Sequence, residues 1–233
     1  MFFPRLAAAA ALLLAAASPA DAAFLTESQL LTQFGFNSST PGSISAAWDS
    51  FSTPVAGPNF ADVGSSGFTG AQPTVTQNIP GAFITSGGNI YSFQVATDFD
   101  VAVPTGVLSG DTTTFIAQIR TLGTEIAPAS LLLGALGAAP VAPASITEIA
   151  RTPLGGFGGE LVNQLIVWNV SGPVSAGSPA FGLEFNAAGS SMSLDSLQIN
   201  AFASTAAVPE PGTLLLTGIG AVGAVLVRRR KTH

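Results

Sequence analysis

The chain has 233 residues, of which only 9% are charged, and it contains no cysteine and a single histidine, His233. These counts exclude a disulfide framework and a thiolate metal site, so the fold has to depend on its apolar core. Eleven acidic side chains and two arginines lie between residues 23 and 203, an excess of nine negative charges that argues against nucleic acid or anionic lipid as a partner of this region.

The first 22 residues have the pattern of a secretory signal peptide. Arg5 is followed by an apolar run over residues 6–17 and by the small residues Ala20 and Ala22. A basic region, an apolar region and a small-residue cleavage site in this order are typical of a cleaved export signal. We therefore expect cleavage after Ala22 and export of the chain that follows.

The middle of the chain begins with a short helix or first strand at residues 24–36, and residues 52–88 are rich in loop-forming residues. Residues 90–103 then alternate with a period of two, which predicts a strand. Asp98 and Asp100 are expected on its solvent face. The residues expected on its core face are Tyr91, Phe93, Val95, Phe99, Val101 and Val103.

Four further segments have strand patterns. Residues 112–121 place Phe115, Ala117 and Ile119 opposite Gln118 and Arg120, and residues 181–186 alternate in the same way. Residues 161–170 are apolar on both parities, which predicts a central strand covered on both faces. In residues 192–199 the apolar parity changes near Asp195, which predicts a β-bulge or a break in the strand.

Short strands separated by Gly- and Pro-rich loops favour an all-β fold. We expect an antiparallel β-sandwich, jelly-roll-like, formed by residues 23–203. Residues 204–211 follow as a linker. The segment from Gly155 to Gly159 is interpreted as a flexible loop because a strand pattern, and not a helix, comes after it.

The C-terminal region has three parts. Pro209, Glu210 and Pro211 form a rigid, extended approach. Residues 212–227 are uncharged and predict one C-terminal transmembrane helix of about 24 Å. The helix is followed by a basic stop in residues 228–233, which is expected to stay cytoplasmic while the preceding domain is outside. The basic residues of this stop are Arg228, Arg229, Arg230 and Lys231.

Residues 208–231 resemble the sorting signal of PEP-CTERM proteins, in which a Pro-Glu-Pro motif precedes a short apolar helix and an arginine cluster. The resemblance implies recognition by exosortase, a membrane-embedded protease or transpeptidase that cuts near the motif. It also implies an inner-membrane single-pass stage before processing and an envelope or extracellular location afterwards. Such proteins occur in Gram-negative bacteria that make exopolysaccharide.

The exported region offers little for catalysis. It has neither the imidazole nor the thiol that Ser-His-Asp or Cys-His catalysis needs, and carboxylates alone rarely build a zinc site. Glu160, Glu184 and Asp195 are candidates for a pair of glycosidase carboxylates, although the favoured interpretation is that they are charges on the solvent face of strands. A calcium ion bound by Asp98, Asp100 and Asp111 is a further alternative without a loop signature.

Three aromatic side chains are candidates for contacts with sugar rings. Trp168 and Tyr91 are expected in the core, whereas Trp48 lies in a polar segment and is the candidate glycan contact. The resulting hypothesis is a sorted envelope or extracellular-matrix protein with a structural or adhesive β domain, no enzymatic activity, no cofactor and no metal. Its expected partners are exosortase and, in one alternative, exopolysaccharide bound by a carbohydrate-binding module. A carboxylate-dependent glycosidase is the other alternative.

Overall fold

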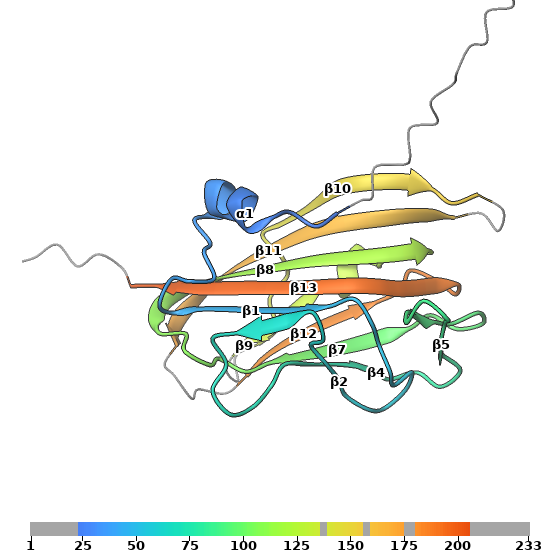
Figure 1. Ribbon diagram of the computed structural model, residues 1–233, viewed down its shortest axis with the longest axis horizontal. Helices are drawn as coiled ribbons and strands as arrows, with labels where there is room; N and C mark the ends of the chain where they lie inside the picture. The colour runs from blue at the N-terminus through green and yellow to red at the C-terminus, as the bar shows by residue number, and fades with distance from the viewer. Residues whose placement is uncertain (1–22, 136–138, 156–158, 175–179, 206–233) are drawn as a thin grey trace, which may run out of the picture.

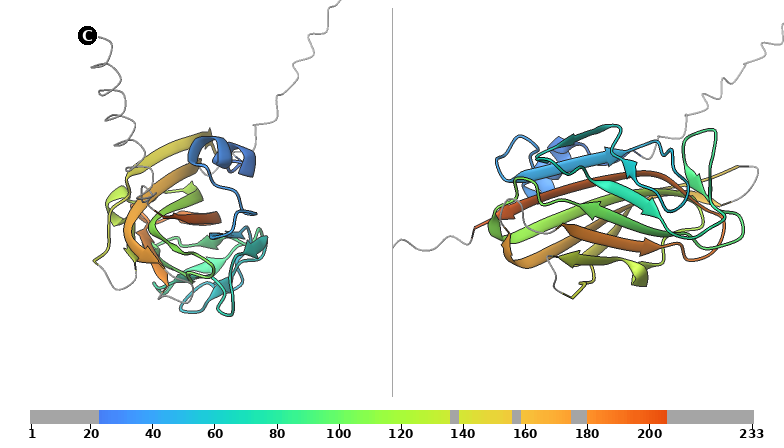
Figure 2. Two further views of the ribbon diagram at one scale, coloured as in Figure 1. Left: turned by 90° about the vertical axis from the view of Figure 1, so that its left-hand side faces the viewer. Right: turned by 90° about the horizontal axis from the view of Figure 1, so that it is seen from below.

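The computed structural model describes residues 23–135, 139–155, 159–174 and 180–205. In this part of the chain two antiparallel sheets face each other as a sandwich, which confirms the predicted all-β fold (Figures 1 and 2). The jelly-roll connectivity stays a prediction. The left view of Figure 2 looks along the strands and shows the two sheets curving around a shared interior.

The larger sheet has eight strands, and its three longest strands lie next to one another. Their order is β10 (Ser145–Pro153), β11 (Glu160–Val174), β8 (Gly110–Gly123), β13 (Met192–Ser204), β1 (Ser43–Trp48) and β3 (Gly64–Ser66), with β6 (Ile90–Tyr91) beside β13 and β5 (Phe83–Ile84) beside β6. Residues 52–88, expected to form loops, therefore also contribute short strands.

The smaller sheet has five strands and covers the inner face of the larger one. Their order is β2 (Asn59–Phe60), β4 (Thr74–Gln77), β7 (Asp98–Val103), β12 (Phe181–Asn186) and β9 (Leu132–Ala135). A short 3₁₀ helix, η1 (Pro128–Ser130), precedes β9.

The main core lies between the sheets and follows the predicted alternation. Phe99 of β7 stacks on Phe185 of β12 with ring centroids 5.0 Å apart. Phe115 of β8 contacts both Trp168 of β11 and Phe181 of β12, so it joins the two sheets. These side chains are fully buried, as the strand patterns at residues 112–121, 161–170 and 181–186 predicted.

Helix α1 and the segment before it cover part of the outer face of the larger sheet. This cover explains why Gln118 of β8 departs from its predicted exposure. Helix α1 (Glu27–Phe34) begins with a capping box between Thr26 and Gln29 and lies outside β8 and β11 (Figure 1). Gln118 was expected to face solvent but is fully buried, because the segment before α1 covers it. Its side-chain oxygen accepts a hydrogen bond of 2.6 Å from the backbone N–H of Leu25.

The predicted strand over residues 90–103 is wrong in its first half. Strand β6 ends at Tyr91 and β7 begins only at Asp98. Phe93 and Val95, expected in the core, are exposed by 64% and 37%. Their period-two spacing continues across a break between two strands of different sheets, so the alternation there has no structural meaning.

The phase change near Asp195 is confirmed as a β-bulge. The pairing of β13 with β8 shifts between Leu194 and Ser196, so Asp195 is left without a partner in the ladder. The bulge lets Leu194 and Leu197 both face the core. It also turns the Asp195 carboxylate towards Arg120 on β8, with which it forms an ion pair.

Candidate functional site

The predicted signal peptide, the sorting residues Pro209, Glu210 and Pro211, and the basic stop all lie outside the described residues. Within the described ranges, no helix combines the length and the apolar character needed to cross a bilayer. The sorting and membrane predictions are therefore not addressed by the fold.

The predicted glycan contact at Trp48 has to be corrected. The indole is fully buried in the core between the sheets, and its Nε1–H donates a hydrogen bond of 3.0 Å to the carbonyl of Asn59. A side chain without exposed surface cannot stack on a sugar ring. The polar residues that follow Trp48 in the sequence lie beyond the end of β1, so their polarity does not indicate an exposed indole.

The three candidate carboxylates lie in different places. Glu160 begins β11 and forms an ion pair with Arg151. Asp195 lies at the bulge of β13, where it binds Arg120 and accepts a hydrogen bond of 2.8 Å from Asn89. Glu184 is exposed on β12 of the other sheet. The two acids of the larger sheet are thus occupied by arginine partners.

Metal ligands also do not converge in the part of the chain that the structure describes, where no three His, Cys, Asp or Glu side chains could hold one ion. Asp100 instead accepts a hydrogen bond of 2.9 Å from the side-chain amide of Asn78.

Arg151 on β10 organises a group of three glutamates. Its guanidinium donates to Glu148 at 2.6 Å and to Glu125 at 2.7 Å, and it also binds Glu160. The hydrogen bond from Arg151 holds the pKa of Glu148 below its usual value, and the same bond, with that to Glu125, raises the pKa of Arg151. Three acids around one base leave a net negative charge at this edge of the sheet.

Two aspartates, Asp49 and Asp62, form an acidic pair near the Asp195 bulge. The backbone N–H of Asp49 donates to the Asp62 carboxylate at 3.1 Å. Loss of hydration raises the pKa of the Asp49 carboxyl, and its contact with Asp62 raises that pKa further, whereas the Arg120 charge opposes the shift. This arrangement gives Asp49 a greater tendency to hold a proton than an isolated aspartate has.

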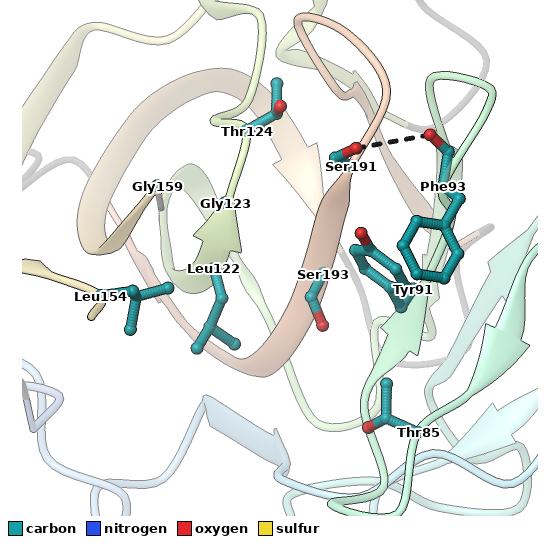
Figure 3. A pocket seen from close by; sticks show the side chains of 10 residues that line it. All are labelled: Thr85, Tyr91, Phe93, Leu122, Gly123, Thr124, Leu154, Gly159, Ser191 and Ser193. Atoms are coloured by element: carbon teal, nitrogen blue, oxygen red, sulfur yellow. Dashed lines mark hydrogen bonds between the residues drawn. The ribbon is translucent and has the colours of Figure 1, made fainter. Parts of the chain in front are cut away.

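One open pocket with a volume of about 710 Å³ lies at the end of the larger sheet where β8 ends and β11 and β13 begin (Figure 3). Tyr91 and Phe93 line one side, and Leu122 and Leu154 line the other. The remaining lining residues are small or carry hydroxyls: Thr85, Gly123, Thr124, Gly159, Ser191 and Ser193. None of the lining residues that the structure describes is charged.

The aromatic side of the pocket belongs to a cluster of three rings. Phe83 contacts Tyr91 edge-on at 5.5 Å and is stacked near Phe93 at 5.8 Å, while Tyr91 and Phe93 meet edge-on at 4.7 Å. Phe83 is 41% exposed. Rings that contact one another while remaining exposed form a rigid apolar surface, which is typical of a binding site and unusual for a solvated edge.

The floor of the pocket depends on close backbone approaches. Gly123 and Gly159 have φ values of +83° and +86°, and a Cβ on Gly159 would lie 2.8 Å from the Cα of Gly123. Ser191 also has a positive φ, 67°, and its hydroxyl donates to the carbonyl of Phe93 at 3.3 Å (Figure 3). A non-glycine residue in this conformation carries strain of a kind that is concentrated at functional sites.

In the comparison with protein families, residues 207–231 match the PEP-CTERM protein-sorting motif. The chain carries a PEP-CTERM motif. This confirms the resemblance seen in the sequence, and it marks the chain as an exported protein that is processed by exosortase. Comparisons with curated proteins and with solved structures give no match.

The PEP-CTERM motif covers the Pro-Glu-Pro segment and the basic stop but leaves the whole sandwich unassigned. The pocket is a feature of the sandwich that sequence reasoning missed. Its residues come from five separate segments of the chain. The alternation placed Phe93 in the core, so no pattern in the sequence pointed to the pocket. Tyr91, expected in the core, is half-buried at the pocket wall.

Proposed function

We propose that this protein is an envelope or extracellular-matrix component in which the β-sandwich serves a structural or adhesive role after exosortase processing. The observation that supports this proposal best is the PEP-CTERM motif joined directly to a sandwich with a large, well-packed core. The sandwich acts by binding and not by catalysis in this proposal. The separate positions of Glu160, Glu184 and Asp195, two of them paired with arginines, support that choice.

In the proposal, residues 212–227 hold the chain in the inner membrane and residues 228–231 stay in the cytoplasm until cleavage near Pro209, Glu210 and Pro211. The acidic side chain between two prolines is the recognition element. Prolines keep the backbone extended and remove hydrogen-bond donors, so the peptide is accessible to a protease.

The test is replacement of Glu210 by alanine in the native host, followed by cell fractionation and mass spectrometry of both termini. We expect the Glu210→Ala protein to accumulate in the inner membrane with its C-terminal segment intact. Glu184→Ala, which removes an exposed glutamate from the sandwich, is the matched control and should be processed normally. Normal release of the Glu210→Ala protein would contradict the recognition role.

A second candidate function, carbohydrate binding, is favoured by a specific observation. The uncharged pocket beside Tyr91 and Phe93 combines exposed rings with hydroxyl groups. This candidate would define the adhesive role.

A further inference from the structure

We infer that the pocket between β6, β8 and β13 binds a neutral polysaccharide, with Phe93 as its central contact. The inference rests on the proposed adhesive function and names its ligand class and its site. It uses a surface entirely different from that of Trp48, which is buried.

The lining matches the chemistry of a sugar chain. Each sugar ring has C–H-rich faces that pack on aromatic rings and a rim of hydroxyls that exchange hydrogen bonds with polar groups. Tyr91 and Phe93 supply the aromatic faces. Hydroxyl partners come from Thr85, Thr124, Ser191 and Ser193, which line the same pocket.

Charge selects a neutral ligand. The pocket itself has no charged lining residue, while Glu125 and Glu160 directly follow the lining residues Thr124 and Gly159. These two glutamates and Glu148 share only Arg151, so the surroundings of the pocket are negative. Uronic acids and other anionic sugars are therefore disfavoured by repulsion.

The shape selects an extended ligand over a single sugar. A second hollow, of about 340 Å³, adjoins the pocket and is formed by Phe83, Phe93, Val95 and neighbouring loop residues. Phe93 lines both hollows, so the two meet at this residue. A chain of sugars lying across Phe93 would occupy both, whereas a monosaccharide would fill only one.

The exposure of Phe93 separates a binding role from a packing role. A phenyl ring that is 64% exposed contributes little to the core, so its removal should leave the fold intact. Phe60 on β2 of the other sheet is 58% exposed and offers a matched control. The two variants, Phe93→Ala and Phe60→Ala, remove the same group from equally exposed positions.

The test uses the processed protein purified from its host and affinity electrophoresis in gels that contain dextran, barley β-glucan, galactomannan or alginate. We expect retardation by at least one of the three neutral polymers and none by alginate. Phe93→Ala should weaken the binding about tenfold or more, the loss typical of a central aromatic anchor. Phe60→Ala should bind like the parent, and thermal unfolding should be the same for all three proteins.

A second measurement places the ligand. Tyr91 is the only tyrosine of the chain, so protein with ¹³C-labelled tyrosine gives ring signals from this site alone. An oligosaccharide from the retarding polymer should shift these signals in the parent and in Phe60→Ala, and at about tenfold higher concentration in Phe93→Ala.

Several results would overturn the inference. These are the absence of retardation by every neutral polymer, equal retardation of the Phe93→Ala protein, or retardation by alginate alone. Self-association that depends on Phe93, without retardation, would instead make this surface an interface between copies. Detergent-extracted Glu210→Ala protein should bind as the parent does, so failure of sorting and failure of binding are distinguishable.

Discussion

At the scale of single residues, a few surface carboxylates form hydrogen bonds and ion pairs with defined partners. Glu27 of α1 accepts hydrogen bonds of 2.6 Å from both the backbone N–H and the hydroxyl of Ser38. These bonds favour the ionised carboxylate and lower the pKa of Glu27 below its ordinary value of 4.5. Glu27 thus ties the helix to the loop that leads into β1.

This pKa shift predicts a dependence of stability on pH. Because the folded state lowers the pKa of Glu27, its stabilising contribution is present above about pH 4.5 and is lost as the pH falls through the lowered pKa. Glu27→Gln should therefore lower the melting temperature at pH 7, and the difference from the parent should shrink towards pH 3. Thermal unfolding followed by circular dichroism between pH 3 and pH 7 measures this.

The matched control is Glu184→Gln, which removes an exposed carboxylate from β12. A difference between Glu27→Gln and the parent that stays constant over the whole pH range would contradict the role of the Ser38 hydrogen bonds.

Sequence reasoning succeeded for some residues and failed for others, for physical reasons. Alternation identified the inward side chains of β12 because one face of that strand is dry and the other is wet. It failed for Gln118, because the segment before α1, which is distant from β8 along the chain, covers that residue. It failed for Trp48, because burial of an isolated tryptophan depends on both sheets. The pocket could not be predicted, since no single segment contains it.

At the scale of elements, α1 packs on the outer face of the larger sheet through a small apolar cluster. Leu30 and Phe36 contact Ile116 of β8 together with Leu165 and Val167 of β11, and all five are buried. Two side chains of the sheet also bind the backbone before the helix. The Asn163 amide donates to the carbonyl of Ala23 at 3.1 Å, and the Gln118 side chain accepts from the N–H of Leu25. The helix is therefore docked by both apolar and polar contacts.

Neighbouring leucines of α1 test this docking. Leu30 is fully buried, whereas Leu31 is 47% exposed. Leu30→Ala should lower the free energy of unfolding by about 2–5 kcal/mol, because it leaves a cavity between helix and sheet. Leu31→Ala should change it by less than about 0.5 kcal/mol. Urea unfolding of both variants measures the two values, and equal losses would contradict the docked arrangement.

The Asp195 bulge shows what an element-level pattern can reveal. A change of parity within one strand requires an extra residue in the ladder, and the position of that residue was evident from the sequence. The ion pair with Arg120 was not, because the partner lies on another strand. Residues 90–103 show the opposite case. Their alternation is regular, although the chain passes from one sheet to the other within this segment.

At the scale of the whole molecule, β8 and β13 form the centre of the larger sheet, and both of their edges are paired. We expect their amides near Ile119 and Leu197 to exchange with solvent only through global unfolding, while the α1 amides exchange through local opening and therefore faster. Native-state hydrogen exchange read by NMR or mass spectrometry measures the two classes. Protection of α1 equal to that of β8 would contradict this order.

Strand β13 has the pocket at its first residues and Ser204, close to the sorting segment, at its last. Thirteen residues of extended chain separate these poles by roughly 40 Å. In the proposed processing, exosortase therefore cuts near Pro209, five residues after the strand end that is remote from the pocket. If the new terminus is joined to a surface acceptor, the protein is attached covalently at one end of β13. In the proposed function it binds polysaccharide reversibly at the other end.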